Sequence, residues 1–306
     1  MTDTVDRSTE GRNFVAALVV AMRPRQWAKN VLVFAAPLAA GQLFVPEILL
    51  PSIGAFVAFC LISSATYLIN DVRDIEADRV HPRKAARPIP AGDLPVPGAI
   101  TAAVLLAASS LILSAFISLA LLGVIVAYAV FTLSYSLGLK HEPVIELALL
   151  ALGFLLRAIA GGAASGLPIS QWFLIVAGFG SLFMAAGKRY SELDRFVREG
   201  NNDDDSPKRK SLDGYTLGYL RFVWGVAAAV TITSYCLWAF DVAETPSSFP
   251  WAEWSVLPFV LAILRYGVSV DRGDAEAPED TALRDRVLLL LGLAWLILFG
   301  LGALGV

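Results

Sequence analysis

Residues 56–78 read FVAFCLISSATYLINDVRDIEAD, an apolar run that passes directly into a cluster of acids. The apolar part has no charged side chain and belongs to a window that is long enough to cross a bilayer as a helix. If this helix continues through the acids, Asp71, Asp74 and Asp78 lie at i, i+3 and i+7, and their carboxylates share one face. The stretch therefore predicts a membrane helix that ends in several acidic side chains on one side.

A cluster of cations follows these acids in the sequence. Asn70 lies four residues before the second acid and joins the edge of the acidic face. Converging oxygen ligands suit Mg²⁺, which usually takes its remaining ligands from water and substrate phosphates. Arg83, Lys84 and Arg87 come shortly downstream and suit the phosphate oxygens that the metal leaves uncovered. We therefore expect Asn70 and the three acids to hold Mg²⁺ on a diphosphate; the alternative is a solvated, charged helix end.

The composition is that of an integral membrane protein. Of the 306 residues, 57% are hydrophobic and only 17% are charged, and the charges avoid long stretches of the chain. The apolar runs are too long for strands and do not alternate, which indicates helices. Nine windows have the length of a membrane helix, at residues 14–44, 47–70, 95–114, 116–138, 143–165, 170–190, 215–240, 253–271 and 283–305. The sequence therefore predicts an all-α integral membrane protein with nine transmembrane helices.

Lysine and arginine gather in alternate connections between these windows. They precede the first window and follow the second, fourth, sixth and eighth. The intervening connections, near residues 42–47, 114–116, 161–171 and 241–253, contain neither residue. By the positive-inside tendency, the N-terminus and the charged connections are cytoplasmic and the C-terminus lies outside. We therefore expect a multi-pass protein of the plasma membrane whose active site faces the cytoplasm.

We expect one membrane domain over residues 1–306. Residues 1–12 are polar and predict a flexible N-terminus without a cleavable signal peptide. Residues 71–94 and 188–214 are rich in charge and predict cytosolic loops that cap the helices.

Polar side chains beside or inside the apolar windows are candidates for substrate binding, because they are costly in a membrane unless they face a cavity or a partner. The candidates are Arg25, Lys29, Asn30, Tyr67, Tyr128 and Tyr135. The first three belong to the segment RPRQWAKN, residues 23–30, for which an interfacial anchor is the alternative role. The two last tyrosines are seven residues apart, a spacing that suits a pocket or the packing of helices equally well.

Two further candidate sites contain cations. Arg157 lies well inside a window. A ligand contact and a structural role, in an ion pair or in binding carbonyl groups, are equally consistent with this position. Lys188, Arg189, Tyr190 and Glu192 end the sixth window much as the acids end the second, but here the cations come first. We expect this cluster to contact phosphate oxygens, and the alternative is a positively charged cytoplasmic flank.

The motifs Trp27-Ala28-Lys29-Asn30 and Asn70-Asp71-x-x-Asp74-x-x-x-Asp78, together with nine windows, resemble the UbiA superfamily of intramembrane prenyltransferases over nearly the whole chain. The resemblance implies helices around a central membrane cavity, with Mg²⁺ bridging Asp-rich motifs to a diphosphate. Ordinary members carry a second motif, Asp-x-x-x-Asp, after the sixth helix. Here that place reads KRYSELD, residues 188–194, a basic and degraded motif that argues against an ordinary prenyl-diphosphate donor.

The longer motifs RPRQWAKN, NDVRDIEADRVHP and GKRYSEL are similar to one branch of this superfamily, the phosphoribosyltransferases that act on decaprenyl phosphate. The resemblance implies transfer of 5-phosphoribose from phosphoribosyl diphosphate (PRPP) to decaprenyl or another polyprenyl phosphate, an early step toward cell-wall arabinan. The additional cations fit PRPP, which carries a 5-phosphate besides its diphosphate. The partners are then PRPP and membrane lipid, no nucleic acid is expected, and the formation of a homo-oligomer is left open.

On this resemblance Asp71, Asp74 and Asp78 are the catalytic residues, which hold Mg²⁺ on the departing diphosphate while the lipid phosphate attacks C1 of ribose. Two alternatives stay open. One is a prenyltransferase of the same fold that moves an isoprenoid chain from its diphosphate to an aromatic acceptor. The other is a transporter in which Arg157 and the acids bind an ion, and its flux would not require Mg²⁺.

Overall fold

The computed structural model describes residues 13–82, 84–198, 212, 214–242, 249–275, 281 and 283–304. Within these ranges the chain is helical and contains no strand, in agreement with the all-α prediction. The helices are α1 (Phe14–Ala21), the 3₁₀ helix η1 (Pro24–Phe34), α2 (Ala35–Ala39), α3 (Pro46–Arg73), α4 (Ile75–Arg79), α5 (Pro88–Ala91), α6 (Val96–Ile117), α7 (Leu119–Leu137), the 3₁₀ turn η2 (Leu139–His141), α8 (Ile145–Ser165), α9 (Gln171–Arg198), α10 (Leu217–Val242), α11 (Trp251–Asp271) and α13 (Arg286–Leu304).

Eight of the described helices are long and apolar enough to cross a membrane, namely α3, α6, α7, α8, α9, α10, α11 and α13. Each corresponds to one of the last eight windows predicted from the sequence. The prediction of an all-α, multi-pass membrane protein is therefore confirmed.

The first predicted window, residues 14–44, is broken into three short helices. Arg23 has a left-handed backbone conformation, with φ 57°, and separates α1 from η1. Because Pro24 follows, the ordinary helical conformation is disfavoured at Arg23. The break at Arg23 was not expected, since the sequence predicted one spanning window over residues 14–44. The count of nine spanning helices thus becomes eight long helices and one broken segment.

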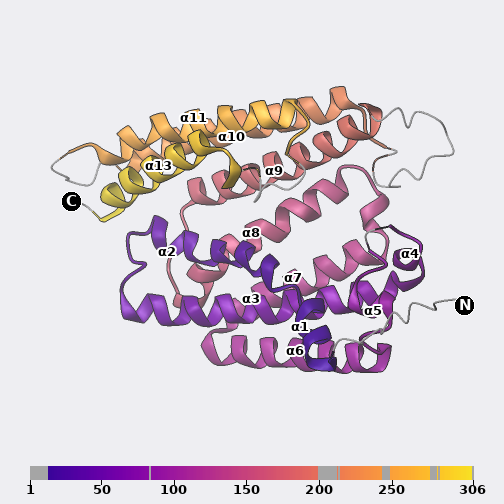
Figure 1. Ribbon diagram of the computed structural model, residues 1–306. Coiled ribbons are helices and arrows are strands. Elements are labelled where there is room, and N and C mark those ends of the chain that lie inside the picture. Colours follow the sequence, from indigo (N-terminus) through magenta and orange to yellow (C-terminus); the bar gives the residue numbers. More distant parts are fainter. Residues whose placement is uncertain are drawn as a thin grey trace, which may run out of the picture.

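The long helices lie in two layers, which Figure 1 shows from the side. Helices α9, α10, α11 and α13 form the upper layer, and α3, α6 and α7 lie in the lower part. Helix α8 connects the two, because Leu147 packs in a cluster with residues of α9 and α10, while Leu156 packs with residues of α3 and α7.

Successive long helices run in opposite directions, so the ends of α3, α7 and α9 and the starts of α6, α8 and α10 lie toward the right of Figure 1. The end of α11 and the start of α13 belong to the same side, because their residues line one pocket with Arg195 near the end of α9. We call this side of the bundle the charged end. The cation-rich connections after the second and fourth windows lie there, and so do the described ends of the helices that flank the connections after the sixth and eighth windows.

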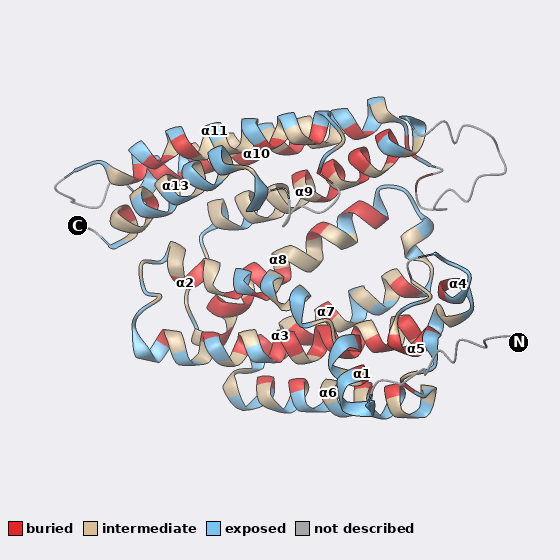
Figure 2. Ribbon diagram, viewed as in Figure 1, coloured by how far each residue is buried: buried red, intermediate tan, exposed pale blue. Residues whose placement is uncertain are grey.

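Buried residues lie on the helix faces that meet neighbouring helices, as the red segments of Figure 2 show. Many outward-facing residues are exposed and apolar; Phe116 and Leu290 are examples. Since lipid tails are as apolar as leucine, association of such helices depends on close packing. Gly161 of α8 is an example of such close packing, because a Cβ atom there would lie 2.1 Å from the carbonyl oxygen of Val33 in η1.

Candidate active site

Helix α3 ends at Arg73, at the charged end of the bundle. Asp74 leaves the helical conformation, with φ −91° and ψ 12°, and the short helix α4 begins directly after it. The expectation that one helix carries all three acids on one face is therefore wrong. Asp74 pairs with Lys140, whereas Asp71 and Asp78 share Arg87, so the three like charges do not lie together on one face.

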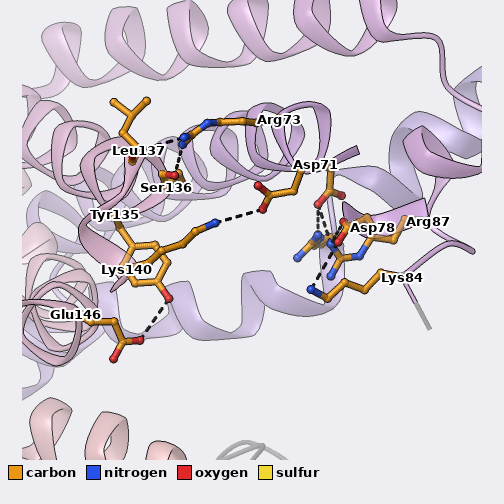
Figure 3. A network of polar contacts seen from close by, with 12 residues as sticks. Asp71, Arg73, Asp78, Lys84, Arg87, Tyr135, Ser136, Leu137, Lys140 and Glu146 are labelled. Atoms are coloured by element: carbon orange, nitrogen blue, oxygen red, sulfur yellow. Dashed lines mark hydrogen bonds and ion pairs between the residues drawn. The ribbon is translucent and has the colours of Figure 1, made fainter. Parts of the chain in front are cut away.

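Arg87 links two of the three acids. Its Nη1 atom lies 3.1 Å from Oδ1 of Asp71 and 2.6 Å from Oδ2 of Asp78 (Figure 3). Both acids are almost completely buried, with 1% and 2% of their surface exposed. Arg23 adds a bond of 2.5 Å to Asp71, and Lys84 lies 3.5 Å from Asp78. Two buried carboxylates and three cations thus form one compact cluster, which we call the Asp71–Asp78 cluster.

Asp74 points to a different partner. Its Oδ2 atom lies 3.6 Å from Nζ of Lys140, which follows α7. Arg73 donates to the carbonyl oxygens of Ser136 and Leu137, at the end of the same helix (Figure 3). These contacts join the end of α3 to the end of α7. Among the described contacts, Asp74 shares no cation with the Asp71–Asp78 cluster.

The donor set of this cluster fits Mg²⁺. No group of three or more acidic, histidine or cysteine ligands suited to a metal occurs among the described residues. Mg²⁺ does not need one, because it is commonly bound through one or two carboxylates, with substrate phosphates and water as the other ligands. Asp71 and Asp78 already hold a single cationic nitrogen between them. Their oxygens could hold a cation of another kind in the same way.

A pocket of about 270 Å³ lies beside the cluster. It is lined by Val20, Ala21, Arg23, Asp71, Ala86, Arg87 and Pro88. The guanidinium of Arg23 also lies 4.9 Å from the centre of the Tyr67 ring, in a cation–π arrangement. Tyr67, a substrate-binding candidate, therefore borders the same region through Arg23.

A second network is centred on Arg189, which is 2% exposed. Its guanidinium pairs with Glu146 of α8 and with Glu192 one turn further along α9. The hydroxyl of Tyr135 lies 3.4 Å from Glu146 and accepts a bond of 3.3 Å from Arg189. Arg189 was expected to contact phosphate; the structure gives it two carboxylate partners inside the protein.

Neighbouring residues extend this network. Lys188 lies 4.0 Å from Glu192, and the hydroxyl of Tyr190 accepts from Arg221 at 2.7 Å. Before α10, Tyr215 accepts a bond of 2.8 Å from the backbone N–H of Val144. Burial raises the pKa of Tyr215 to about 12, so its hydroxyl stays neutral at physiological pH.

Arg157 lies inside α8 and is 6% exposed. It donates to the Asn30 side-chain oxygen at 2.8 Å, to the Tyr128 hydroxyl at 2.8 Å and to the Gly153 carbonyl at 2.6 Å. These acceptors are neutral, and the aromatic rings of Tyr128, Phe59 and Phe154 lie around the guanidinium. The three bonds agree with a structural role for Arg157, one of the two roles that the sequence left open. They also bring Asn30 and Tyr128 into contact with the same guanidinium group.

The remaining candidates differ in their exposure. Arg25 is exposed, and Lys29 and Asn70 are half-buried. Arg83 lies outside the described residues, as do residues 1–12 and most of residues 199–213.

Several residues of these networks were not among the candidates predicted from the sequence, among them Arg23, Lys140 and Glu146. Arg23 stands in the RPRQWAKN segment, Lys140 is the isolated cation after the fourth window, and Glu146 is the only acid within the apolar run 143–165. An isolated charge near a window edge was therefore a signal for Lys140 and Glu146, whereas Arg23 lies inside the first window with other cations nearby.

Comparisons with known proteins agree with this fold. The model of the UbiA prenyltransferase family matches residues 30–293. A decaprenyl-phosphate phosphoribosyltransferase of Corynebacterium glutamicum is 51% identical over 289 residues, which cover 93% of this chain and 86% of the relative. The protein of the same name from Mycobacterium tuberculosis is 50% identical over 292 residues, 94% of each chain. A solved UbiA homologue from Archaeoglobus fulgidus, bound to GPP and Mg²⁺, has the same fold, with a TM-score of 0.66 at 18% identity over 95% of this chain and 100% of the other.

Proposed function

The chain belongs to the UbiA prenyltransferase family, and from this membership we propose that it transfers 5-phosphoribose from PRPP to decaprenyl phosphate and releases diphosphate. The observation that carries the proposal is the identity of 51% and 50% to two decaprenyl-phosphate phosphoribosyltransferases over more than nine-tenths of the chain. The product would serve the synthesis of cell-wall arabinan.

The geometry supports a donor with several phosphate groups. Arg23 and Arg87 line the 270 Å³ pocket, and Lys84 forms an ion pair with Asp78 of the adjoining cluster. Guanidinium groups bind phosphate oxygens through two parallel bonds, so both arginines can exchange a carboxylate partner for a phosphate when the donor enters. We assign the diphosphate to this pocket, with Arg25, Lys29, Arg83, Lys188 and Arg189 as further proposed phosphate contacts.

Asp71 and Asp78, with Asn70 and Asp74 beside them, would hold Mg²⁺, and the homologue from A. fulgidus contains this ion. When bound there, Mg²⁺ would neutralise the charge that develops on the departing diphosphate. The burial of Asp71 and Asp78 strengthens their interaction with any cation between them, because the local dielectric is low.

The acceptor requires positioning more than proton transfer. A phosphate monoester is already anionic at neutral pH, so its oxygen can attack C1 of ribose without a general base. The residues near the site therefore act by orienting the two substrates and by stabilising charge. The polyprenyl chain would lie along apolar helix surface within the bilayer, and the charged end would face the cytoplasm, where PRPP is found.

Incubation of the purified protein with radiolabelled PRPP, decaprenyl phosphate and Mg²⁺ in detergent tests the proposal. We expect a labelled, organic-soluble phosphoribosyl lipid whose formation requires both substrates. A parallel incubation with a prenyl diphosphate and an aromatic acceptor should give no product. Prenylation of the acceptor without phosphoribosyl transfer would overturn the proposal in favour of the ordinary family reaction.

A further inference from the structure

A second pocket lies at the charged end, between the end of α11 and the start of α13. Its volume is about 740 Å³, and none of its residues lines the pocket beside the Asp71–Asp78 cluster. The lining consists of Arg195, Arg265, Val268, Ser269, Arg272, Gly273, Asp274, Thr281, Arg284, Asp285, Arg286 and Val287. We call it the arginine pocket, because five of these residues are arginines.

Three of the five arginines form no ion pair with a described residue, and two acids, Asp274 and Asp285, also line the pocket. Arg265 pairs with Asp285 at 2.7 Å. That bond lowers the pKa of Asp285, so its carboxylate stays ionised. The carboxylate also caps the N-terminus of α13, because it accepts hydrogen bonds from the backbone N–H groups of Val287 and Leu288. Arg272, Arg284 and Arg286 form no ion pair with another described residue.

Apolar side chains border the arginines. Val268 and Val287 line the pocket and are 41% and 49% exposed. Leu264 and Leu290, one turn further toward the centres of α11 and α13, are 57% and 67% exposed. Cations at the end of a spanning helix, followed by exposed apolar residues toward its centre, match the order of headgroup and acyl chain in a phospholipid.

We propose that the arginine pocket binds a phosphate ester at a site separate from the transfer reaction. The phosphate would lie among Arg272, Arg284 and Arg286, whose guanidinium groups are suited to its oxygens. The arrangement of apolar residues favours the headgroup of an anionic phospholipid, and a soluble phosphate carries the same chemistry. Such a ligand would join α11 to α13 at the membrane surface.

Binding to the full-length, delipidated protein can be measured by native mass spectrometry with phosphatidylglycerol, phosphatidylcholine and inorganic phosphate as separate probes. We expect phosphatidylglycerol to bind more tightly than phosphatidylcholine. The double variant R272Q/R284Q should bind phosphatidylglycerol roughly tenfold more weakly, from the contribution of each surface cation to anionic-lipid binding. R272K/R284K keeps the charge and should retain most of the binding.

A matched control, K208Q/R209Q, removes the same charge from the connection between α9 and α10 and should bind as the original protein does. If inorganic phosphate binds with the same dependence on Arg272 and Arg284 and displaces the lipid, the site serves a soluble phosphate. Equal binding of both lipids, or equal loss in the control, would overturn the proposal. So would absence of binding in the original protein, the result expected if Glu276, Glu279 and Asp280 of the same connection neutralise the arginines. None of these readouts depends on phosphoribosyl transfer, so the two proposals fail independently.

Discussion

At the scale of single residues, Arg87 makes Asp71 and Asp78 one unit, because one guanidinium nitrogen contacts both buried carboxylates. Replacement of Asp78 by asparagine keeps the shape of the side chain and removes its charge. We expect Asp78→Asn to reduce phosphoribosyl transfer roughly hundredfold, the usual effect of losing one electrostatic contact at a reacting group. Initial rates with saturating PRPP and lipid measure this loss.

The control for this variant is Glu76→Gln, on the same short helix α4. The side chain of Glu76 is 82% exposed and pairs only with Arg79 among the contacts described. The Glu76→Gln variant should therefore transfer phosphoribose at nearly the normal rate. Near-normal activity of Asp78→Asn would show that the metal assignment is wrong.

Removal of divalent metal tests the same carboxylates without a mutation. On the proposed assignment, two buried acids supply the protein ligands and the substrate supplies others, so the ion should exchange readily. We expect an excess of EDTA to reduce transfer to background and added Mg²⁺ to restore it, measured as labelled lipid formed. Transfer that persists in a metal-free assay would contradict a metal role.

The sequence indicated part of this residue arrangement. Asp71, Asp78, Lys84 and Arg87 were recognised as neighbouring charges of one segment, and the structure brings them together. The departure of Asp74 was not predictable from helical spacing, because it depends on a helix break and on Lys140 from a different helix. Pairing between distant elements is the information that periodicity does not contain.

At the scale of elements, the pair of Glu146 and Arg189 joins the start of α8 to the end of α9. Both side chains are almost completely buried, so removal of one charge leaves the other poorly compensated. We expect Glu146→Gln to lower the free energy of unfolding by roughly 3 kcal/mol, at the lower end of such losses because Glu192 still pairs with Arg189. The midpoint of thermal unfolding in detergent reports the change.

Glu192→Gln provides the comparison. The side chain of Glu192 is 17% exposed, so water partly compensates for its loss, and we expect a smaller decrease of about 1 kcal/mol. If the two variants were equally stable, Glu146 would not be the main partner of Arg189.

Close approach of η1 and α8 gives a second prediction for elements. A Cβ atom at Gly161 would overlap the backbone of Val33, and backbone atoms cannot move aside as a flexible side chain can. We expect Gly161→Ala to destabilise the protein by roughly 1–3 kcal/mol through overpacking. Gly225→Ala in α10 is the control, because no atom lies within 4 Å of its added Cβ. Its unfolding midpoint should stay the same or rise, since alanine favours helix.

Apolar periodicity and length predicted the eight long helices well, because in a membrane a helix of about 20 residues is needed for each crossing. The broken first segment was not predicted correctly. Its composition is as apolar as that of a spanning helix, and its interruption depends on the backbone conformation of Arg23 before Pro24.

At the scale of the whole molecule, the alternation of cation-rich and cation-free connections is a geometric property of the bundle. Eight long helices that run alternately up and down place every second connection at the same end, which makes the charged end continuous. The sequence predicted this arrangement. It did not predict the two layers or the position of α8 between them, because these depend on which helix faces pack together.

The orientation of the charged end can be tested by thiol labelling in intact cells. In a background with Cys60→Ala and Cys236→Ala, two single variants carry a thiol at opposite ends. His141 and Ser170 are both exposed, the first at the charged end and the second in the opposite connection between α8 and α9. By the positive-inside tendency, a membrane-impermeant maleimide should label Ser170→Cys in intact cells and His141→Cys only after permeabilisation. The reverse pattern would place the Asp71–Asp78 cluster outside the cell, away from cytoplasmic PRPP, and the proposed reaction would then have no donor.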